Sequence, residues 1–267
     1  MTYIPKKTKV LIFSPHIDDV EFGIPFYYVR ALQLGFNVTE VVMTNSEFGT
    51  HRLEFKGKRL RQIRIRELKN SVKLFHEYTH NRTNLIYLNY IDGHLPLNSK
   101  TVAQVSDIIR EEIPEIVLAP DPWYILDHHP DHIHTGILVF LALRKIKSDY
   151  FPKKIYYYYT YNSNQYFRVH WKDRNIIYKA YKCFQSQVSP LQRKYLKLIY
   201  LYLYCRRYFK SGFFTENFRE QSIRHNKVEH PKKMYLLQKF KYHFYRKLTL
   251  PKVQEFHNLT PRELGLL

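Results

Sequence analysis

Cysteine, glycine and acidic side chains are scarce in this chain of 267 residues. The two cysteines, Cys183 and Cys205, give neither a disulfide framework nor zinc-knuckle spacing, so we expect a reducing compartment. No internal repeat or low-complexity linker is visible. The length therefore predicts one or two compact domains, and 45% hydrophobic residues suffice for a sizeable core.

Long hydrophobic runs are absent. No run reaches the length of about 20 apolar residues that a membrane-spanning helix needs. Residues 192–208 come nearest, as a predicted helix with apolar and aromatic bulk between charges. This helix either packs on the core with basic ends or lies in a membrane interface. Residues 1–9 lack the apolar segment of a secretory signal. We expect a cytoplasmic protein, with a peripheral position on the inner face of the membrane as an alternative.

Apolar segments alternate with amphipathic ones along the first 160 residues. Strands are expected at residues 9–14, 37–44, 85–89, 116–119 and 155–160. Helices are expected at residues 21–34, 57–76, 101–112 and 132–146. This alternation predicts an α/β fold, a Rossmann-like three-layer sandwich whose mostly parallel sheet has helices on both faces.

Two clusters of His and Asp stand more than a hundred residues apart. They consist of His16, Asp18 and Asp19, and of His128, His129, Asp131 and His132. The first follows a predicted buried strand, and the carboxyl ends of such strands are where open α/β sheets place their ligands. Imidazole and carboxylate groups suit zinc, and catalytic zinc commonly has three protein ligands. His16, Asp19 and His132 are candidate ligands, which leaves Asp18 as a candidate base.

Each cluster also has a purely structural interpretation. An Asp-Asp pair after a strand is usually a helix cap and first turn, and histidines beside Pro130 are typical of an exposed turn. We expect His134 to be structural or solvated. The presence of both clusters, each beside an expected strand end, favours the metal site, and a cap can also be a ligand.

Both motifs resemble those of one known family. Pro15-His16-Ile17-Asp18-Asp19-Val20-Glu21 and His129-Pro130-Asp131-His132 are similar to the motifs of PIG-L (LmbE-like) metal-dependent N-acetylglucosaminyl de-N-acetylases. Weaker likenesses lie between and after them, so that the resemblance spans about residues 8–219. They are Thr44 to Glu47, Arg64 to Glu67, Tyr90 to Leu95, Tyr178 to Lys182, Ser186 to Val188 and Phe214 to Arg219.

The resemblance implies a role for nine residues. It assigns His16, Asp19 and His132 to Zn²⁺ or another divalent ion, Asp18 to the general base, and His129 to oxyanion stabilisation or leaving-group protonation. It makes Asp131 the support of a ligand histidine and gives sugar hydroxyl contacts to Glu47, Arg64 and Asp92. Two of these also have structural interpretations: Arg64 could form a solvated helix pair with Glu67, and Asp92-Gly93 could be a plain turn.

The chain departs from the family pattern near both motifs. Ile17 stands where the family usually has proline, and Gly23-Ile24-Pro25 replaces a pair of glycines, which makes the helix start there uncertain. Asp127 occupies a position where some sugar deacetylases carry a carbonyl-polarising tyrosine. His128 beside His129 leaves open which of the two imidazoles serves the reaction.

Positive charge is concentrated in the C-terminal half. Residues 1–149 carry 19 Lys and Arg against 17 Asp and Glu, and the remainder carries 24 against 6. We expect residues 1–219 to form the deacetylase domain and residues 220–267 a basic, aromatic, helical extension. A phosphate-bearing sugar or an anionic membrane surface would complement this charge, and nucleic acid is the less favoured partner. A biased genome composition would explain it equally well.

Two functions therefore follow from the sequence. The leading one is metal-dependent removal of acetate from an N-acetylated amino sugar, in a free, nucleotide-linked or lipid-linked form. The alternative is a nucleic-acid- or membrane-binding protein that uses the basic half and retains a vestigial metal site.

Overall fold

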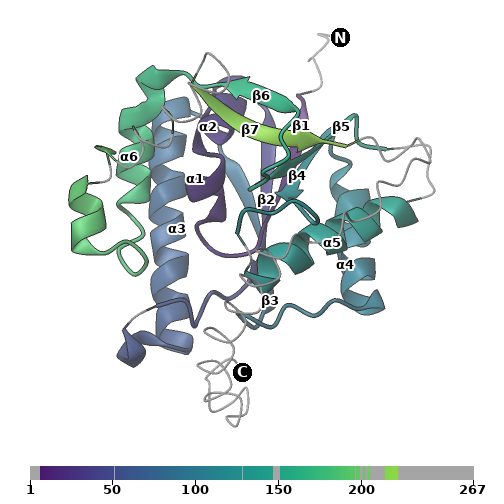
Figure 1. Ribbon diagram of the computed structural model, residues 1–267, viewed down its shortest axis with the longest axis horizontal. Helices are drawn as coiled ribbons and strands as arrows, with labels where there is room; N and C mark the ends of the chain where they lie inside the picture. Colours follow the sequence, from purple (N-terminus) through teal and green to yellow (C-terminus); the bar gives the residue numbers. More distant parts are fainter. Residues whose placement is uncertain are drawn as a thin grey trace, which may run out of the picture.

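The computed structural model is a three-layer α/β sandwich (Figure 1). It describes residues 7–50, 52–127, 129–146, 151–195, 197–198, 201, 204 and 214–221. The predicted extension, residues 220–267, lies outside these apart from its first two residues. Among the described helices, none is long and apolar enough to cross a bilayer.

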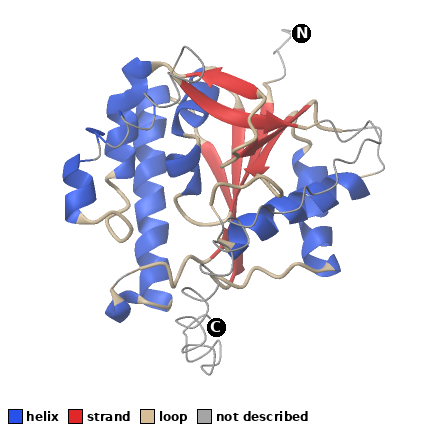
Figure 2. Ribbon diagram, in the orientation of Figure 1, coloured by secondary structure: helices blue, strands red, loops and turns tan. Residues whose placement is uncertain are grey.

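The sheet contains seven strands in the order β3-β2-β1-β4-β5-β7-β6. Figure 2 shows the strands in red. The five parallel strands are β1 (Lys9–Ser14), β2 (Asn37–Thr44), β3 (Thr83–Tyr90), β4 (Ile116–Pro120) and β5 (Lys154–Tyr158). Two antiparallel strands, β7 (Thr215–Glu220) and β6 (Gln165–Arg168), extend the β5 edge. The chain leaves β1 toward β2 and returns to β4 on its other side, so a topological switch point lies between β1 and β4.

Helices cover both faces of the sheet. One face carries α1 (Asp19–Gly23), α2 (Pro25–Gln33), α3 (Lys58–Thr79) and α6 (Arg174–Tyr181), and the other carries α4 (Ser99–Glu112) and α5 (Pro130–Lys145) (Figure 1). Two short 3₁₀ turns, η1 (Leu53–Phe55) and η2 (Trp171–Asp173), precede α3 and α6. β1 is buried along almost its whole length because it is covered on both sides, as its continuous apolar run predicts.

The predicted helix over residues 21–34 is in fact two helices. Ile24 has an extended φ of −140° and separates α1 from α2, which begins with Pro25. Proline disfavours helical geometry in the residue before it, yet is well suited to the first position of a helix. The Gly23-Ile24-Pro25 sequence therefore breaks the helix, and α1 forms a short separate turn beside β1.

A carboxylate from the far end of the chain completes the start of α2. The two carboxylate oxygens of Glu216, in β7, accept hydrogen bonds from the backbone N–H of Phe26 (2.9 Å) and of Tyr27 (2.7 Å). The hydroxyl of Tyr204 donates to the same carboxylate at 3.1 Å. Pro25 has no N–H, so Glu216 satisfies the next two unpaired donors of the helix and places negative charge at its positive end.

Candidate active site

The His and Asp clusters meet at the carboxyl ends of the parallel strands, beside the switch point. β1 leads directly into His16, and the loop after β4 leads into His129 and α5. Gly136 allows α5 to lie close to β4, because a Cβ atom there would be 2.5 Å from the carbonyl oxygen of Pro120. The fold thus brings together residues separated by more than a hundred positions.

Hydrogen bonds hold the turn after β1 without the proline of the family pattern. The backbone N–H of His16 donates to the Asp19 carboxylate (2.8 Å), and the backbone N–H of Asp18 donates to the carbonyl of His16 (3.0 Å). The N–H of Ile17 donates to the hydroxyl of Ser46 at 2.9 Å. Ser46 follows β2, so the neighbouring strand fixes the position at which a proline would otherwise stiffen the chain.

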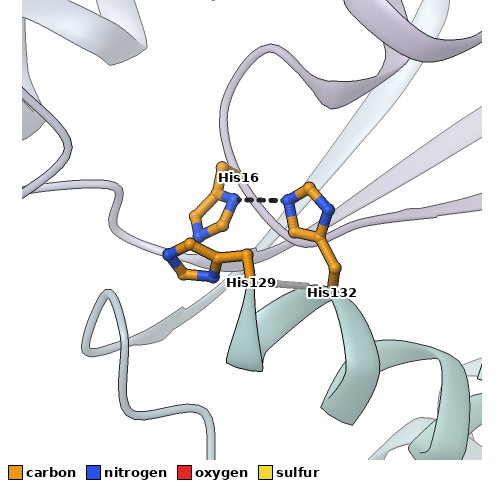
Figure 3. A group of neighbouring side chains, drawn as sticks. All are labelled: His16, His129 and His132. Atoms are coloured by element: carbon orange, nitrogen blue, oxygen red, sulfur yellow. Dashed lines mark hydrogen bonds between the residues drawn. The ribbon is translucent and has the colours of Figure 1, made fainter. Parts of the chain in front are cut away.

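The three side chains of the predicted ligand set lie close together. Figure 3 shows two of them, His16 and His132, with His129 beside them. His16 Nδ1 lies 3.1 Å from His132 Nε2 and 3.2 Å from one carboxylate oxygen of Asp19, whose other oxygen lies 3.3 Å from His132 Nε2. All three side chains are buried. Nitrogen and oxygen ligands bind zinc at about 2.0–2.2 Å, and a tetrahedron with such bonds separates its ligands by about 3.4 Å. The donor types and these pairwise spacings are compatible with a divalent ion, although Asp19 belongs to neither of the two groups of described side chains that could hold a metal.

Carboxylates behind His16 fix the orientation of its ring. His16 Nε2 lies 3.2 Å from an oxygen of Asp131 and 3.2 Å from an oxygen of Asp92. Burial opposes protonation of His16, but hydrogen bonds to Asp131, Asp19 and Asp92 raise its pKa well above the ordinary value. As a metal ligand, His16 would keep its proton on Nε2, facing Asp131 and Asp92, and turn the Nδ1 lone pair toward His132 and Asp19. Asp131 is fully buried and also accepts from the backbone N–H of Gly93 (2.6 Å) and Leu95 (3.0 Å).

Asp18 faces an arginine instead of the ligand set. Its carboxylate lies 2.6 Å from Nη2 of Arg64, which is buried in α3. Burial raises the pKa of Asp18 to about 6, although the guanidinium of Arg64 opposes the rise. Asp18 is therefore ionised at neutral pH and retains an affinity for a proton.

His129 caps α5 and remains neutral. Its Nδ1 accepts a hydrogen bond from the backbone N–H of Asp131 at 3.2 Å, so its proton belongs on Nε2. Burial, together with the charge of His16, lowers the pKa of His129 to about 4. Its ring meets the His16 ring edge to face, with centroids 4.5 Å apart (Figure 3). Among the described residues, His129 with His16 and His132 forms one group able to hold a metal, and with His16, Asp92 and Asp131 another.

The residues predicted to contact sugar differ in their surroundings. Arg64 is bound to Asp18, and the second oxygen of Asp92 accepts from the backbone N–H of Phe48 and of Gly49, both at 3.0 Å. Glu47 is fully buried, and neither of its carboxylate oxygens has a hydrogen-bond partner among the described residues. Burial beside Asp92 raises the pKa of Glu47 to about 8. Sugar contacts by these residues remain predictions.

Two residues near the site carried no functional prediction. Tyr159, after β5, stacks on the His132 ring at 5.4 Å, and its hydroxyl lies 3.2 Å from a carboxylate oxygen of Asp19. Tyr159 has φ of 55°, a conformation that is uncommon for tyrosine and is frequent at functional sites. Asp127 lies 3.5 Å from His132 Nδ1, beyond hydrogen-bonding distance. Residues 156–159 are four consecutive tyrosines, and nothing in the sequence distinguishes Tyr159 from the other three.

Two further histidines, His128 and His134, lie next to the second motif. His134 Nδ1 lies 2.7 Å from the carbonyl oxygen of Leu95, the residue whose N–H donates to Asp131. His128 lies outside the described residues, so the choice between it and His129 rests on the position of His129 alone.

A family model described as GlcNAc-PI de-N-acetylase, PIG-L, matches residues 11–143. This part of the chain belongs to the PIG-L family. The match covers β1 through most of α5, and so includes both clusters of His and Asp.

Named relatives of this PIG-L chain include sugar deacetylases. Diacetylchitobiose deacetylase of Thermococcus kodakarensis is 32% identical over 130 residues, which are 49% of this chain and 47% of the relative. The chain thus aligns with about half the length of that relative. The solved N,N'-diacetylchitobiose deacetylase of Pyrococcus horikoshii superimposes with a TM-score of 0.71 at 26% identity, over 81% of this chain and 84% of the other.

The same fold also carries a different reaction. The 4-carboxy-2-hydroxymuconate hydratase GalB of Pseudomonas putida superimposes with a TM-score of 0.64 at 15% identity, over 85% of this chain and 98% of the other. This likeness shows the fold alone. The reaction therefore has to be argued from the side chains at the strand ends.

Proposed function

We propose that this PIG-L chain is a metal-dependent hydrolase that removes the acetyl group from an N-acetylated amino sugar. The observation that carries the proposal is the cluster of His16, Asp19 and His132, three buried side chains with nitrogen and oxygen atoms 3.1–3.3 Å apart in each pair. The named activity of the two diacetylchitobiose deacetylases supports the choice of an acetylated sugar as substrate.

His16, Asp19 and His132 would hold the ion. Two imidazoles and one carboxylate are a donor set typical of catalytic zinc, and related divalent ions accept the same ligands. When bound, such an ion supplies Lewis acidity to the acetamide carbonyl and to the attacking water. Asp131 and Asp92 keep the Nδ1 atom of His16 turned toward the other two ligands.

Asp18 would take the proton from the attacking water. Its pKa of about 6 lies close enough to neutral pH for it to be an ionised base that can later return the proton. The ion pair with Arg64 fixes the direction of its carboxylate. The surroundings of Asp18 therefore fix the direction of its carboxylate and raise its pKa.

His129 would stabilise the negative charge that develops on the carbonyl oxygen. It is neutral, its Nδ1 is occupied by a backbone N–H, and its remaining ring proton is on Nε2, as a hydrogen-bond donor must be. The amine that leaves needs a proton, which protonated Asp18 or His129 can supply. Whether one residue or both take part is open in this proposal.

A narrower substrate follows from charge. The basic half favours a phosphate-bearing sugar, linked to a nucleotide or a lipid, over a neutral one. The alternative of a binding protein with a vestigial site is less well supported, because the ligand set is buried and its supporting carboxylates are in place. A cytoplasmic location remains a prediction from the sequence.

The test combines metal content with acetate release. We expect purified protein to contain about one zinc or related ion per chain, and the variant His16→Ala with Asp19→Ala to contain none. Asp18→Asn should retain the metal and lose at least 100-fold in acetate release from diacetylchitobiose or N-acetylglucosamine. Asp107→Asn, at an exposed position on α4, is the control and should match the wild type in both assays.

Two outcomes would contradict the proposal. If the double variant retains as much metal as the wild type, the ligand set is wrong. If the metal-loaded wild type releases no acetate from any acetylated amino sugar in a panel, the substrate is a different amide.

A further inference from the structure

A pocket of about 400 Å³ lies between α3 and the chain on either side of residue 186. Three arginines line it, namely Arg52 before η1, Arg66 on α3 and Arg193 near the start of the helix that follows residue 189. None of the three forms an ion pair with a carboxylate of the described part of the chain. Their positive charges are therefore uncompensated by that part of the protein.

Glu67 is the acidic residue among those that line this pocket. Its two carboxylate oxygens accept hydrogen bonds from the backbone N–H (2.8 Å) and the hydroxyl (2.7 Å) of Ser186. Burial raises the pKa of Glu67, and the hydrogen bonds from Ser186 oppose the rise. Glu67 therefore joins two walls of the pocket and leaves the arginines available for an outside anion.

The pocket has an apolar side as well as a charged one. The ring of Phe55 forms part of the wall, and the guanidinium of Arg52 lies 5.2 Å from its centroid. Arg59 lies on the same ring at 4.6 Å but does not line the pocket. Ile63 adds a second apolar contact. The volume lies in the range of small-molecule sites and exceeds the need of a bare inorganic ion.

We propose that this pocket binds a small organic phosphate, with the phosphate held by Arg52, Arg66 and Arg193. Guanidinium groups present paired N–H donors that match phosphate oxygens, and these charge-assisted bonds are the strong ones. Phe55 and Ile63 contact the uncharged part of the ligand. The pocket contains none of the metal-binding side chains, so the proposal does not depend on the deacetylase activity.

The pocket nevertheless adjoins the candidate active site. Arg64, which binds Asp18, and Glu67, which lines the pocket, lie three residues apart on α3, about 4.5 Å along the helix axis. An organic phosphate bound there lies beside the arginine that orients the proposed base. The ligand is thus close enough either to extend toward the proposed metal site or to change the position of Arg64 beside Asp18.

Calorimetric titration of the full chain tests the site directly. The probes are inorganic phosphate, glucose 1-phosphate and, as the uncharged counterpart, glucose. We expect saturable binding of glucose 1-phosphate, weaker binding of phosphate and none of glucose. The variant with Arg52→Gln, Arg66→Gln and Arg193→Gln should bind glucose 1-phosphate at least 10-fold more weakly. Arg59→Gln removes an arginine from the same ring outside the pocket and should stay within twofold of the wild type.

A lipid head group offers the same chemistry and is tested with vesicles. Sedimentation with phosphatidylcholine vesicles, with and without phosphatidic acid, shows whether the phosphate comes from a membrane, in which case the triple variant again loses binding. Equal affinity of the wild type and the triple variant for every phosphate probe, or no saturable binding by the wild type, overturns the proposal. Should the triple variant not fold, Arg66→Gln alone, at an exposed position of α3, provides the comparison.

Discussion

Glu40 gives the sharpest quantitative prediction, because no side chain of the described part of the chain forms a hydrogen bond or an ion pair with its carboxylate. It lies in the middle of β2, paired in register with Ile12 of β1 and Leu85 of β3, and it is fully buried. Neither of its carboxylate oxygens has a hydrogen-bond partner among the described residues. The nearby hydroxyl of Ser14 donates to the carbonyl of His16 instead.

Burial raises the pKa of Glu40 well above its ordinary value, and the nearby carboxylate of Glu21 raises it further. Above pH of about 4.3 the unfolded chain has lost this proton, whereas the folded chain still holds it. Folding then takes up one proton, so stability falls as pH rises toward the folded pKa. The slope for one proton is about 1.4 kcal/mol per pH unit.

Glu40→Gln removes this dependence with almost no change in shape. We expect the stability advantage of the variant over the wild type to grow as pH rises from about 5.5 to about 7.5, with a limiting slope of about 1.4 kcal/mol per pH unit. At pH 4 the two proteins should differ little, because both then carry an uncharged side chain. Glu21, whose pKa burial raises to about 7, is present in both proteins and interacts with Glu40, so the difference between them includes this interaction.

Urea unfolding at pH 5.5, 6.5 and 7.5, in excess chelator, measures the difference. Glu77→Gln, at an exposed position of α3 near Lys73, is the matched control and should show no such slope. A constant difference between Glu40→Gln and the wild type across this range would mean that Glu40 is ionised in the folded protein, and would refute the reasoning.

Three smaller predictions concern support of the site and of the fold. Asp131→Asn should weaken zinc binding about 10- to 100-fold by loosening His16, as measured by calorimetry, and an unchanged affinity would contradict that role. Tyr159→Phe removes a hydroxyl contact with Asp19 and should weaken zinc binding about 2- to 12-fold, whereas no effect would make Tyr159 a packing residue. Glu216→Ala leaves two helix N–H groups unpaired and should cost about 2–4 kcal/mol in urea unfolding, and a loss below about 1 kcal/mol would show that water replaces the carboxylate.

Short-range information in the sequence accounts for what was predicted correctly. The α/β class and the five parallel strands follow from apolar runs whose length and spacing are local properties. The placement of His16 and Asp19 at a strand end follows from the run of apolar residues before them. The residues that follow a parallel strand lie at the edge of the sheet where its carboxyl end is. The recurrence of His129 and His132 after another strand end implied that the two clusters meet.

The remaining features depend on contacts that no local pattern records. Tyr159 reaches the site only because β5 lies beside β4, and its sequence context is that of an ordinary strand. β6 and β7 pair antiparallel at the edge, and neither short polar segment resembles a buried strand. Whether Glu47, Arg64 and Asp92 contact a sugar depends on where a substrate lies, which the sequence does not specify.

The carboxylate of Glu216 also has a consequence for the order in which the protein can be made. α2 is synthesised near the beginning, but the side chain that satisfies its first free N–H groups follows about 190 positions later. Domains form during synthesis as their parts become available. The start of α2, in the layer beside the proposed metal site, therefore lacks its carboxylate partner until β7 has left the ribosome. A chain cut short before residue 214 would keep every proposed metal ligand and still begin α2 with unpaired backbone donors.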